Sequence, residues 1–159
     1  MTSPADPPVV VIGAGPYGLS IAAHLRFCGV DFRIFGSPMH RWRAHMPKGM
    51  FLKSEGCASN LFEPSGGHTL AQYCAEQGLP YAQYGAAVSL ETFTQYGLSF
   101  QRRLVPTVEN EMVTALHKSS ATFEVLLSNG EMLKVNKVVV ATGMSHTAYI
   151  PEALAQLPL

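Results

Sequence analysis

The chain has 159 residues, which is enough for one domain with its own core but short for two. Hydrophobic residues make up 47% and charged residues 14%, so a globular chain is expected rather than a disordered one. Eleven basic residues balance eleven acidic ones, which removes the electrostatic case for binding nucleic acid or an anionic membrane surface.

Targeting signals are not evident in the sequence. No apolar run approaches the roughly 20 residues that a bilayer span needs, so no membrane span is expected. Residues 1–8 have neither the basic nor the apolar segment of a signal peptide. We therefore expect a cytoplasmic protein with one domain over residues 1–159.

The cysteines and histidines do not form a metal or redox motif. Cys28, Cys57 and Cys74 are odd in number, widely spaced and without a CxxC pair. This argues against a disulfide framework, a zinc site and a dithiol redox pair. The six histidines show neither HxH nor HExxH spacing, so no metal site is predicted.

The N-terminal segment predicts a strand, a helix and a second strand. Residues 9–12 are an apolar, β-branched run, which is typical of a strand buried on both faces of a parallel sheet. Residues 16–28 predict a helix, with Gly29 in the place of a helix C-terminal glycine. Residues 31–35 predict the second strand, which completes one βαβ unit.

An irregular stretch and two helices follow. Residues 36–68 are rich in Gly, Pro, Ser and His, and so long an irregular stretch in a compact domain is usually functional or contacts a ligand or partner. Residues 69–77 predict a helix stopped by Gly78, and residues 90–103 predict a longer one.

The last part of the chain predicts three strands in succession. They cover residues 112–117, 122–127 and 132–141, and the third ends in a buried β-branched run. Between the last two strands, Asn129-Gly130 favours a hairpin, since Asn-Gly supplies the positive φ angles of a type I′ turn.

The glycine pattern after the first strand predicts a dinucleotide-binding loop. Gly13 permits a tight turn, Gly15 lets the backbone approach a pyrophosphate, and Gly18 lets the helix pack close to the strand. The helix N-terminus then offers free N–H groups and a positive dipole end to the phosphates. The alternative is a tight strand–helix turn without a ligand. The loop residues are Gly13, Ala14, Gly15, Pro16, Tyr17 and Gly18.

This loop alone leaves the identity of the dinucleotide open. An acidic residue about 20 positions further on usually binds the ribose hydroxyls, but here the second strand ends in Gly36-Ser37. Either a backbone group with Ser37 or His40 holds the ribose, or Arg41 and Arg43 accept the 2′-phosphate of NADP.

Three stretches resemble the N-terminal part of the FAD- and NADPH-dependent flavoprotein monooxygenases. That group includes flavin monooxygenases, Baeyer–Villiger enzymes and amine N-hydroxylases. The first stretch is the fingerprint at residues 9–18, and the last is Val138-Val139-Val140-Ala141-Thr142-Gly143. The middle stretch is Gly49-Met50-Phe51-Leu52-Lys53-Ser54, followed by residues 60–64 and 69–73.

The resemblance implies an α/β fold of the Rossmann-type FAD-binding class, with a parallel sheet and an antiparallel three-stranded β-meander. It also implies contacts with FAD along the chain. Trp42 and His40 would lie beside the adenosine and pyrophosphate, and the backbone of Val113 would contact adenine. Gly36 replaces the group's usual glutamate. The remaining residues implied near the flavin are Leu52, Lys53, Ser54, Ala141, Thr142 and Gly143.

The implied activity is that of an FAD-dependent oxidoreductase of NAD(P)H-dependent monooxygenase type. NADPH, bound by a domain absent from this chain, would reduce the flavin, and O₂ would oxygenate a small-molecule amine, ketone or thioether. No side chain is identified as catalytic, and we expect this part alone to be inactive. The alternatives are an NADP-binding or non-catalytic dinucleotide-binding redox module, and a disulfide-type reductase that the missing CxxC disfavours.

Overall fold

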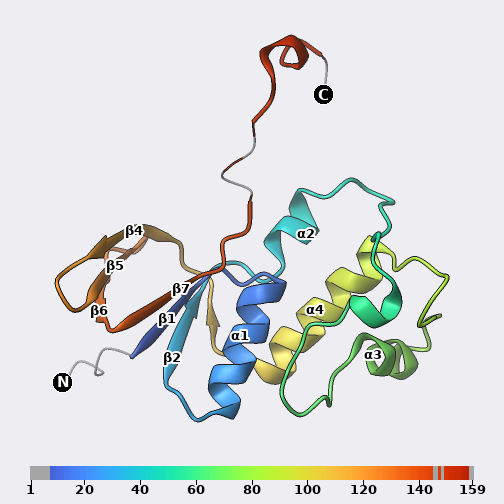
Figure 1. Ribbon diagram of the computed structural model, residues 1–159, viewed down its shortest axis with the longest axis horizontal. Coiled ribbons are helices and arrows are strands. Elements are labelled where there is room, and N and C mark those ends of the chain that lie inside the picture. The colour runs from blue at the N-terminus through green and yellow to red at the C-terminus, as the bar shows by residue number, and fades with distance from the viewer. Residues whose placement is uncertain (1–7, 145–146, 148, 158–159) are drawn as a thin grey trace.

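A parallel β-sheet forms the middle of the structure, a computed structural model that describes residues 8–144, 147 and 149–157 (Figure 1). Its strand order is β3-β2-β1-β7, and all three neighbouring pairs are parallel. The strands are β1 (Val9–Ile12), β2 (Phe32–Phe35), β3 (Val108–Glu109) and β7 (Lys137–Val140).

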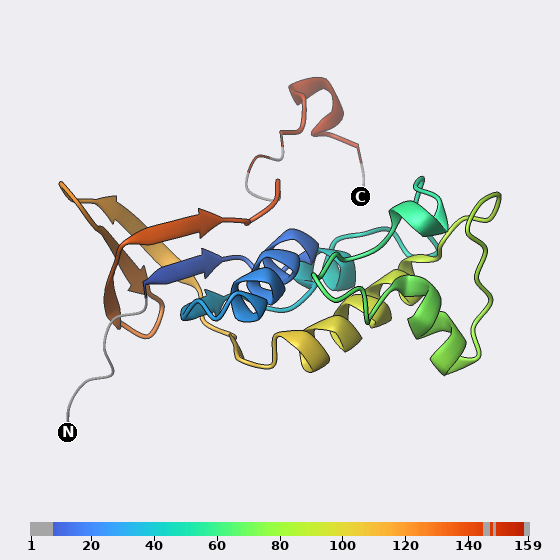
Figure 2. The ribbon, with the colours of Figure 1, turned by 60° about the horizontal axis from the view of Figure 1, so that its bottom comes forward.

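Helices cover one face of this sheet and extend away from it (Figure 2). α1 (Pro16–Phe27) connects β1 to β2 and packs against α4 (Leu90–Leu104), which in turn packs against α3 (Leu70–Gln77). Shorter elements are α2 (His40–Ala44) and the 3₁₀ turns η1 (Gly56–Ala58) and η3 (Glu152–Leu154). Within the described residues, no helix has both the length and the apolar character that crossing a bilayer requires.

The opposite face of the parallel sheet carries the predicted antiparallel meander. It consists of β4 (Val113–Lys118), β5 (Phe123–Leu127) and β6 (Met132–Val135). Because successive side chains of a strand point to opposite faces, the central strands β1 and β2 each contribute to two cores. Val11 and Ile34 pack with the helices, whereas Val10 and Phe35 pack with the meander. The predicted α/β fold with a parallel sheet and a meander is therefore confirmed.

Helix ends follow the predicted signals closely. Gly29 and Gly78 both adopt the left-handed conformation, with φ of 67° and 64°, just beyond α1 and α3. Thr69 begins α3 through a reciprocal capping box with Gln72, so it lies before the helix rather than inside it. The predicted helix limits are correct within one residue.

The strand predicted over residues 132–141 is in fact two strands, which separates the last part of the chain into two sheets. β6 ends the meander, and after Asn136 the chain enters β7 of the parallel sheet. β7 is also less buried than predicted, with Val140 62% exposed. Within the described residues β7 has β1 as its only strand neighbour, so it is an edge strand, and its apolar composition did not guarantee burial along its whole length.

The hairpin between β5 and β6 is confirmed, but its turn type is not the predicted one. Gly130 has φ of 87°, whereas Asn129 has no positive φ, so a type I′ turn is excluded. Gly130 N donates to Leu127 O, and Leu127 N donates to Glu131 O. This pattern is a type I turn with a left-handed glycine that forms a bulge. One positive φ angle is enough for it, and glycine supplies that angle.

The strand β3 and the helix α2 were not predicted from the sequence. β3 is only two residues long and extends the parallel sheet beyond β2. α2 is a five-residue helix inside the stretch predicted to be irregular. Both are held by tertiary contacts, since so short a helix or strand has little stability of its own.

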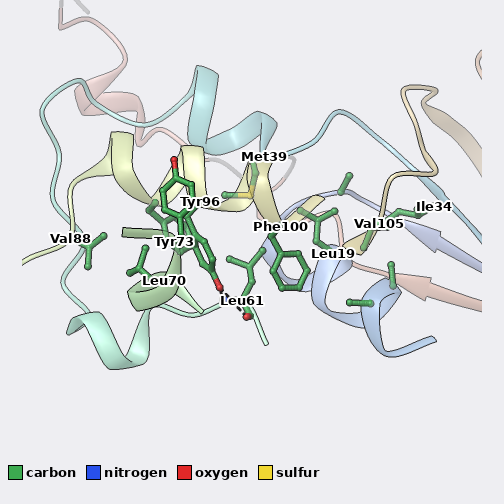
Figure 3. Close-up of a cluster of buried hydrophobic side chains, with 14 of the residues drawn as sticks. Leu19, Ile34, Met39, Leu61, Leu70, Tyr73, Val88, Tyr96, Phe100 and Val105 are labelled. Carbon is green, nitrogen blue, oxygen red and sulfur yellow. Dashed lines mark hydrogen bonds between the residues drawn. The ribbon is translucent and has the colours of Figure 1, made fainter. Parts of the chain in front are cut away.

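Tyr96 anchors the otherwise irregular segment before α3 to the helical core (Figure 3). Its ring is fully buried, and its hydroxyl donates to Leu61 O at 3.2 Å or His68 O at 2.9 Å. The same hydroxyl accepts from Leu61 N at 3.1 Å. Burial raises the pKa of Tyr96 above its ordinary value, so the phenol stays protonated and can keep donating.

The loop that Tyr96 holds contains a buried acid and a buried base. Burial opposes ionisation of Glu63, but hydrogen bonds from Ser65 and from backbone N–H groups lower its pKa. His68 is only 3% exposed, and its Nδ1 lies 3.3 Å from a guanidinium nitrogen of Arg103. Burial, followed by the charge of Arg103, lowers the pKa of His68 below its ordinary value of 6.5.

We expect the substitution Tyr96→Phe to destabilise the fold by about 1–3 kcal/mol, because it leaves buried backbone groups of the Leu61 and His68 segment without a partner. Urea unfolding followed by circular dichroism would measure the change. Tyr84→Phe is the matched control, since Tyr84 is exposed. Equal effects of the two substitutions would contradict the anchoring role.

We expect the free energy of unfolding to fall as the pH drops below 6.5, because the unfolded chain then binds a proton at His68 that the folded chain resists. The His68→Leu variant should lack this component and keep the loss near and below pH 4.5, where Glu63, Glu76 and Glu131 take up protons. His117→Leu, at an exposed position in β4, should retain the wild-type profile. Thermal melts across the pH range would decide between these outcomes.

Candidate functional site

Three loops meet at the carboxyl edge of the parallel sheet, where β1, β2 and β7 end. Gly13 N donates to Phe35 O at 2.8 Å, which joins the first loop to the end of β2. Ala141 N donates to Ile12 O at 2.8 Å, which joins the loop after β7 to the end of β1. Ligands of open α/β sheets bind at this edge.

The three glycines of the predicted loop have the surroundings expected of them: a tight turn at Gly13, open space at Gly15 and close helix packing at Gly18. A Cβ on Gly13 would overlap the carbonyl group of Ala141, and Gly13 also has φ of 109°. A Cβ on Gly18 would overlap the carbonyl group of Gly13, so the first turn of α1 lies directly on the loop. A Cβ on Gly15 would meet no atom within 4 Å. Gly13 and Gly18 therefore serve packing, while Gly15 faces open space.

The N-terminus of α1 is left ready for an anion. Gly15 is the N-cap and provides no side-chain cap, Pro16 stands in the first turn, and that turn has no acidic residue. The first hydrogen bond of the helix runs from Leu19 N to Gly15 O at 2.9 Å. The N–H groups of Tyr17 and Gly18 therefore lack intrahelical acceptors, and they carry the positive end of the helix dipole. The side chain of Tyr17 is 82% exposed beside them.

Gly36 explains why no carboxylate stands at the end of β2. Its φ of 129° is strained for any other residue, and a Cβ there would lie 3.2 Å from Ala14 N. Its N–H donates to Glu109 O in β3 at 2.9 Å. Ser37 follows at the same edge, and His40 N donates to Ser37 O. Ser37, His40 and the main chain thus remain the candidates for the ribose contact.

Met39 holds the glycine loop through a main-chain hydrogen bond to Ala14, and the sequence did not predict this contact. Its N–H donates to Ala14 O at 3.0 Å, and among the described residues it is the sole non-glycine with a positive φ, at 54°. The side chain is fully buried and fills the space that Gly97 of α4 leaves open. Filling a gap in the core is a role expected of methionine, whereas nothing in the local sequence signalled the positive φ or the bond to Ala14.

α2 places the next predicted residues in different surroundings. His40 is exposed, and its Nε2 lies 3.3 Å from Nε2 of His45. Trp42 is half-buried and packs edge-on against Phe93 of α4, with ring centroids 4.5 Å apart. Arg43, a candidate for binding NADP, lines a hollow between α2 and the start of α4.

Leu52, Lys53 and Ser54 are held beside the start of α4. Leu52 N donates to Val88 O at 2.8 Å, and its side chain packs against the helical core. The hydroxyl of Ser54 lies 2.7 Å from that of Ser59, whereas Lys53 is exposed. The structure therefore joins Leu52 to the segment just before α4, and a flavin contact by any of the three residues remains a prediction.

The remaining predicted residues lie at or near the carboxyl edge of the sheet. Ala141 is half-buried against the glycine loop, and Thr142 and Gly143 follow it in exposed positions. Val113 begins β4 and packs in the same core as Phe35 of β2. Their contacts with a cofactor stay predictions.

The described residues include no group of three or more His, Cys, Asp or Glu side chains arranged to hold a metal ion. The three cysteines are free, and they are exposed at Cys28, intermediate at Cys57 and buried at Cys74.

Comparison with solved structures identifies the fold. A flavin-containing monooxygenase from Stenotrophomonas maltophilia matches with a TM-score of 0.75 at 24% identity, over 94% of this chain and 42% of its own. OTEMO in complex with FAD and NADP matches with a TM-score of 0.68 at 19% identity, over 94% and 28%. The bacillithiol disulfide reductase Bdr from Staphylococcus aureus matches with a TM-score of 0.69 at 17% identity, over 88% and 39%.

The other comparisons do not place the chain in a family, since no family model and no curated protein matches it. The chain spans less than half the length of the three solved structures above. Their sequence identities are low, so the likeness concerns the fold. The resemblance to flavoproteins that the sequence motifs indicated is confirmed at that level: the chain has their Rossmann-type fold.

We expect Gly18→Ala to destabilise the protein by roughly 3 kcal/mol or more, because its Cβ would collide with backbone that cannot move aside. Gly15→Ala is the matched control, since Gly15 has an ordinary extended conformation and open space around it, and should change stability by less than about 1 kcal/mol. Urea unfolding of both variants would test this; equal stability would contradict the packing assigned to Gly18.

Proposed function

We propose that this chain is the FAD-binding part of an FAD-dependent oxidoreductase of NAD(P)H-dependent monooxygenase type. The observation that carries the proposal is the opening at Gly15, beside the uncapped N-terminus of α1. A pyrophosphate needs such an approach to backbone N–H groups without an intervening side chain. The adjacent Ala141 loop, fixed to the end of β1, supplies a second wall.

The chain's own groups would bind and orient the cofactor. The N–H groups of Tyr17 and Gly18 would hold the pyrophosphate, and Met39 would keep the loop in position through Ala14. With no carboxylate at Gly36, main-chain groups with Ser37 or His40 would hold the ribose. When bound, FAD would supply the electron-transfer chemistry with NADPH, O₂ and a small-molecule substrate.

FAD is preferred to NADP as the ligand of this loop for two reasons. One of the similar solved structures is a flavin-containing monooxygenase, matched over 94% of this chain, and a second binds FAD in addition to NADP. In addition, Arg43 lines the hollow beside α4. That position favours another role for Arg43 than binding the 2′-phosphate.

Disulfide reduction is the second candidate, because one similar structure is a bacillithiol disulfide reductase. Against a dithiol mechanism on this chain, the sequence has no CxxC and the three cysteines differ widely in exposure. Monooxygenase chemistry needs no such pair, since the flavin carries the reaction.

The test is reconstitution of the purified protein with FAD. We expect bound flavin absorbance at about 370 and 450 nm that stays with the protein on gel filtration. Gly15→Glu should abolish it, because the carboxylate would fill and repel the pyrophosphate position, while the fold stays intact.

The matched control is Ala121→Glu, which adds the same carboxylate at an exposed position with an ordinary backbone conformation in the turn between β4 and β5. This variant should bind FAD as the wild type does. Binding of NADP without FAD, or unchanged FAD affinity in Gly15→Glu, would contradict the proposal.

A further inference from the structure

A cationic hollow lies between α2, residues 48–51 and the start of α4, and no residue of the glycine loop lines it. Its volume is about 420 Å³, which lies in the range of small-molecule sites. Arg43 and Lys48 line it, and Glu91 is its one acidic lining residue, which leaves one net positive charge. In the part of the chain that the structure describes, neither the Arg43 nor the Lys48 side chain has a hydrogen-bond or ion-pair partner.

The rest of this hollow is largely apolar. Trp42, Met50, Phe51 and Leu90 contribute to its wall. Thr94 also lines it and is only 7% exposed, and its hydroxyl oxygen is buried without a hydrogen-bond partner. The hollow therefore combines two unpaired cations with apolar surface and an unused polar group.

A second hollow of about 310 Å³ adjoins the first and has no charged lining residue. The two hollows share Phe51 and Ser89. Phe51 is 60% exposed, although it is a large aromatic residue at the junction. The apolar wall of the second hollow includes Leu70, Cys74, Pro80, Ala82, Ala87 and Val88.

We propose that the two hollows form one binding site for a carboxylic acid with a flexible apolar chain. The carboxylate would pair with Arg43 and Lys48, since charge-assisted hydrogen bonds are stronger than neutral ones. The chain would cross Phe51 into the second hollow and remove this exposed ring from water. The site uses none of the glycine-loop residues, so the inference does not depend on FAD binding.

The test uses Trp42, the one tryptophan of the chain, as an intrinsic fluorescent probe in the first hollow. Decanoate should change its fluorescence saturably, with an affinity roughly tenfold or more above those of decanol and decyltrimethylammonium, which lack the anionic group. Equal or stronger binding of either analogue would overturn the proposal.

Variants locate the two ends of the ligand. The double substitution Arg43→Gln and Lys48→Gln should lower decanoate affinity about tenfold. The control is the double substitution Lys118→Gln and Lys134→Gln in the meander, which removes the same charge and should leave decanoate affinity unchanged. Ala87→Asp should weaken binding by placing a charge in the apolar hollow. Unchanged affinity in the Arg43–Lys48 variant or in Ala87→Asp would overturn the proposal, as would competition between decanoate and FAD.

Discussion

The carboxyl edge of the sheet depends on the close approach of three backbone segments with no side chain between them. The first turn of α1 rests on the carbonyl of Gly13, and the loop after β7 rests on Gly13 itself. Main-chain hydrogen bonds to Phe35 and Ile12 then fix these segments in register. This contact places the uncapped end of α1 beside open space at Gly15. The proposed cofactor site is thus a consequence of backbone packing.

The two faces of the parallel sheet hold this edge in place. Val10 and Phe35 bind the sheet to the meander, and Val11 and Ile34 bind it to the helices. Arg33 reinforces the meander side, since it forms ion pairs with Glu109 of β3 and Glu131 beside β6, each at 2.6 Å. Hydrogen bonds to the two glutamates raise the pKa of Arg33, Glu109 having the larger effect. The short strand β3 thereby stays beside Gly36, where the ribose is proposed to lie.

α4 supports everything that lies outside the sheet. Gly97 accommodates Met39 beneath the glycine loop, Tyr96 holds the segment from Leu61 to His68, and Phe93 packs against Trp42. The start of the same helix borders both hollows of the proposed carboxylate site. One helix therefore positions both the backbone beneath the proposed cofactor and the walls of the proposed second site. The same contacts with α4 give the otherwise irregular segment a defined conformation.

The sequence by itself determined the local features: the strand–glycine–helix order, the helix ends at Gly29 and Gly78, and the order of the meander strands. These follow from periodicity and from glycine's access to positive φ, both of which depend on near neighbours. Only the tertiary structure decided the split after Asn136, the exposure of Val140 and the left-handed Met39 under Ala14. Those features depend on which strand, loop or helix lies alongside. Contacts between distant segments fix that arrangement, and no local pattern encodes it.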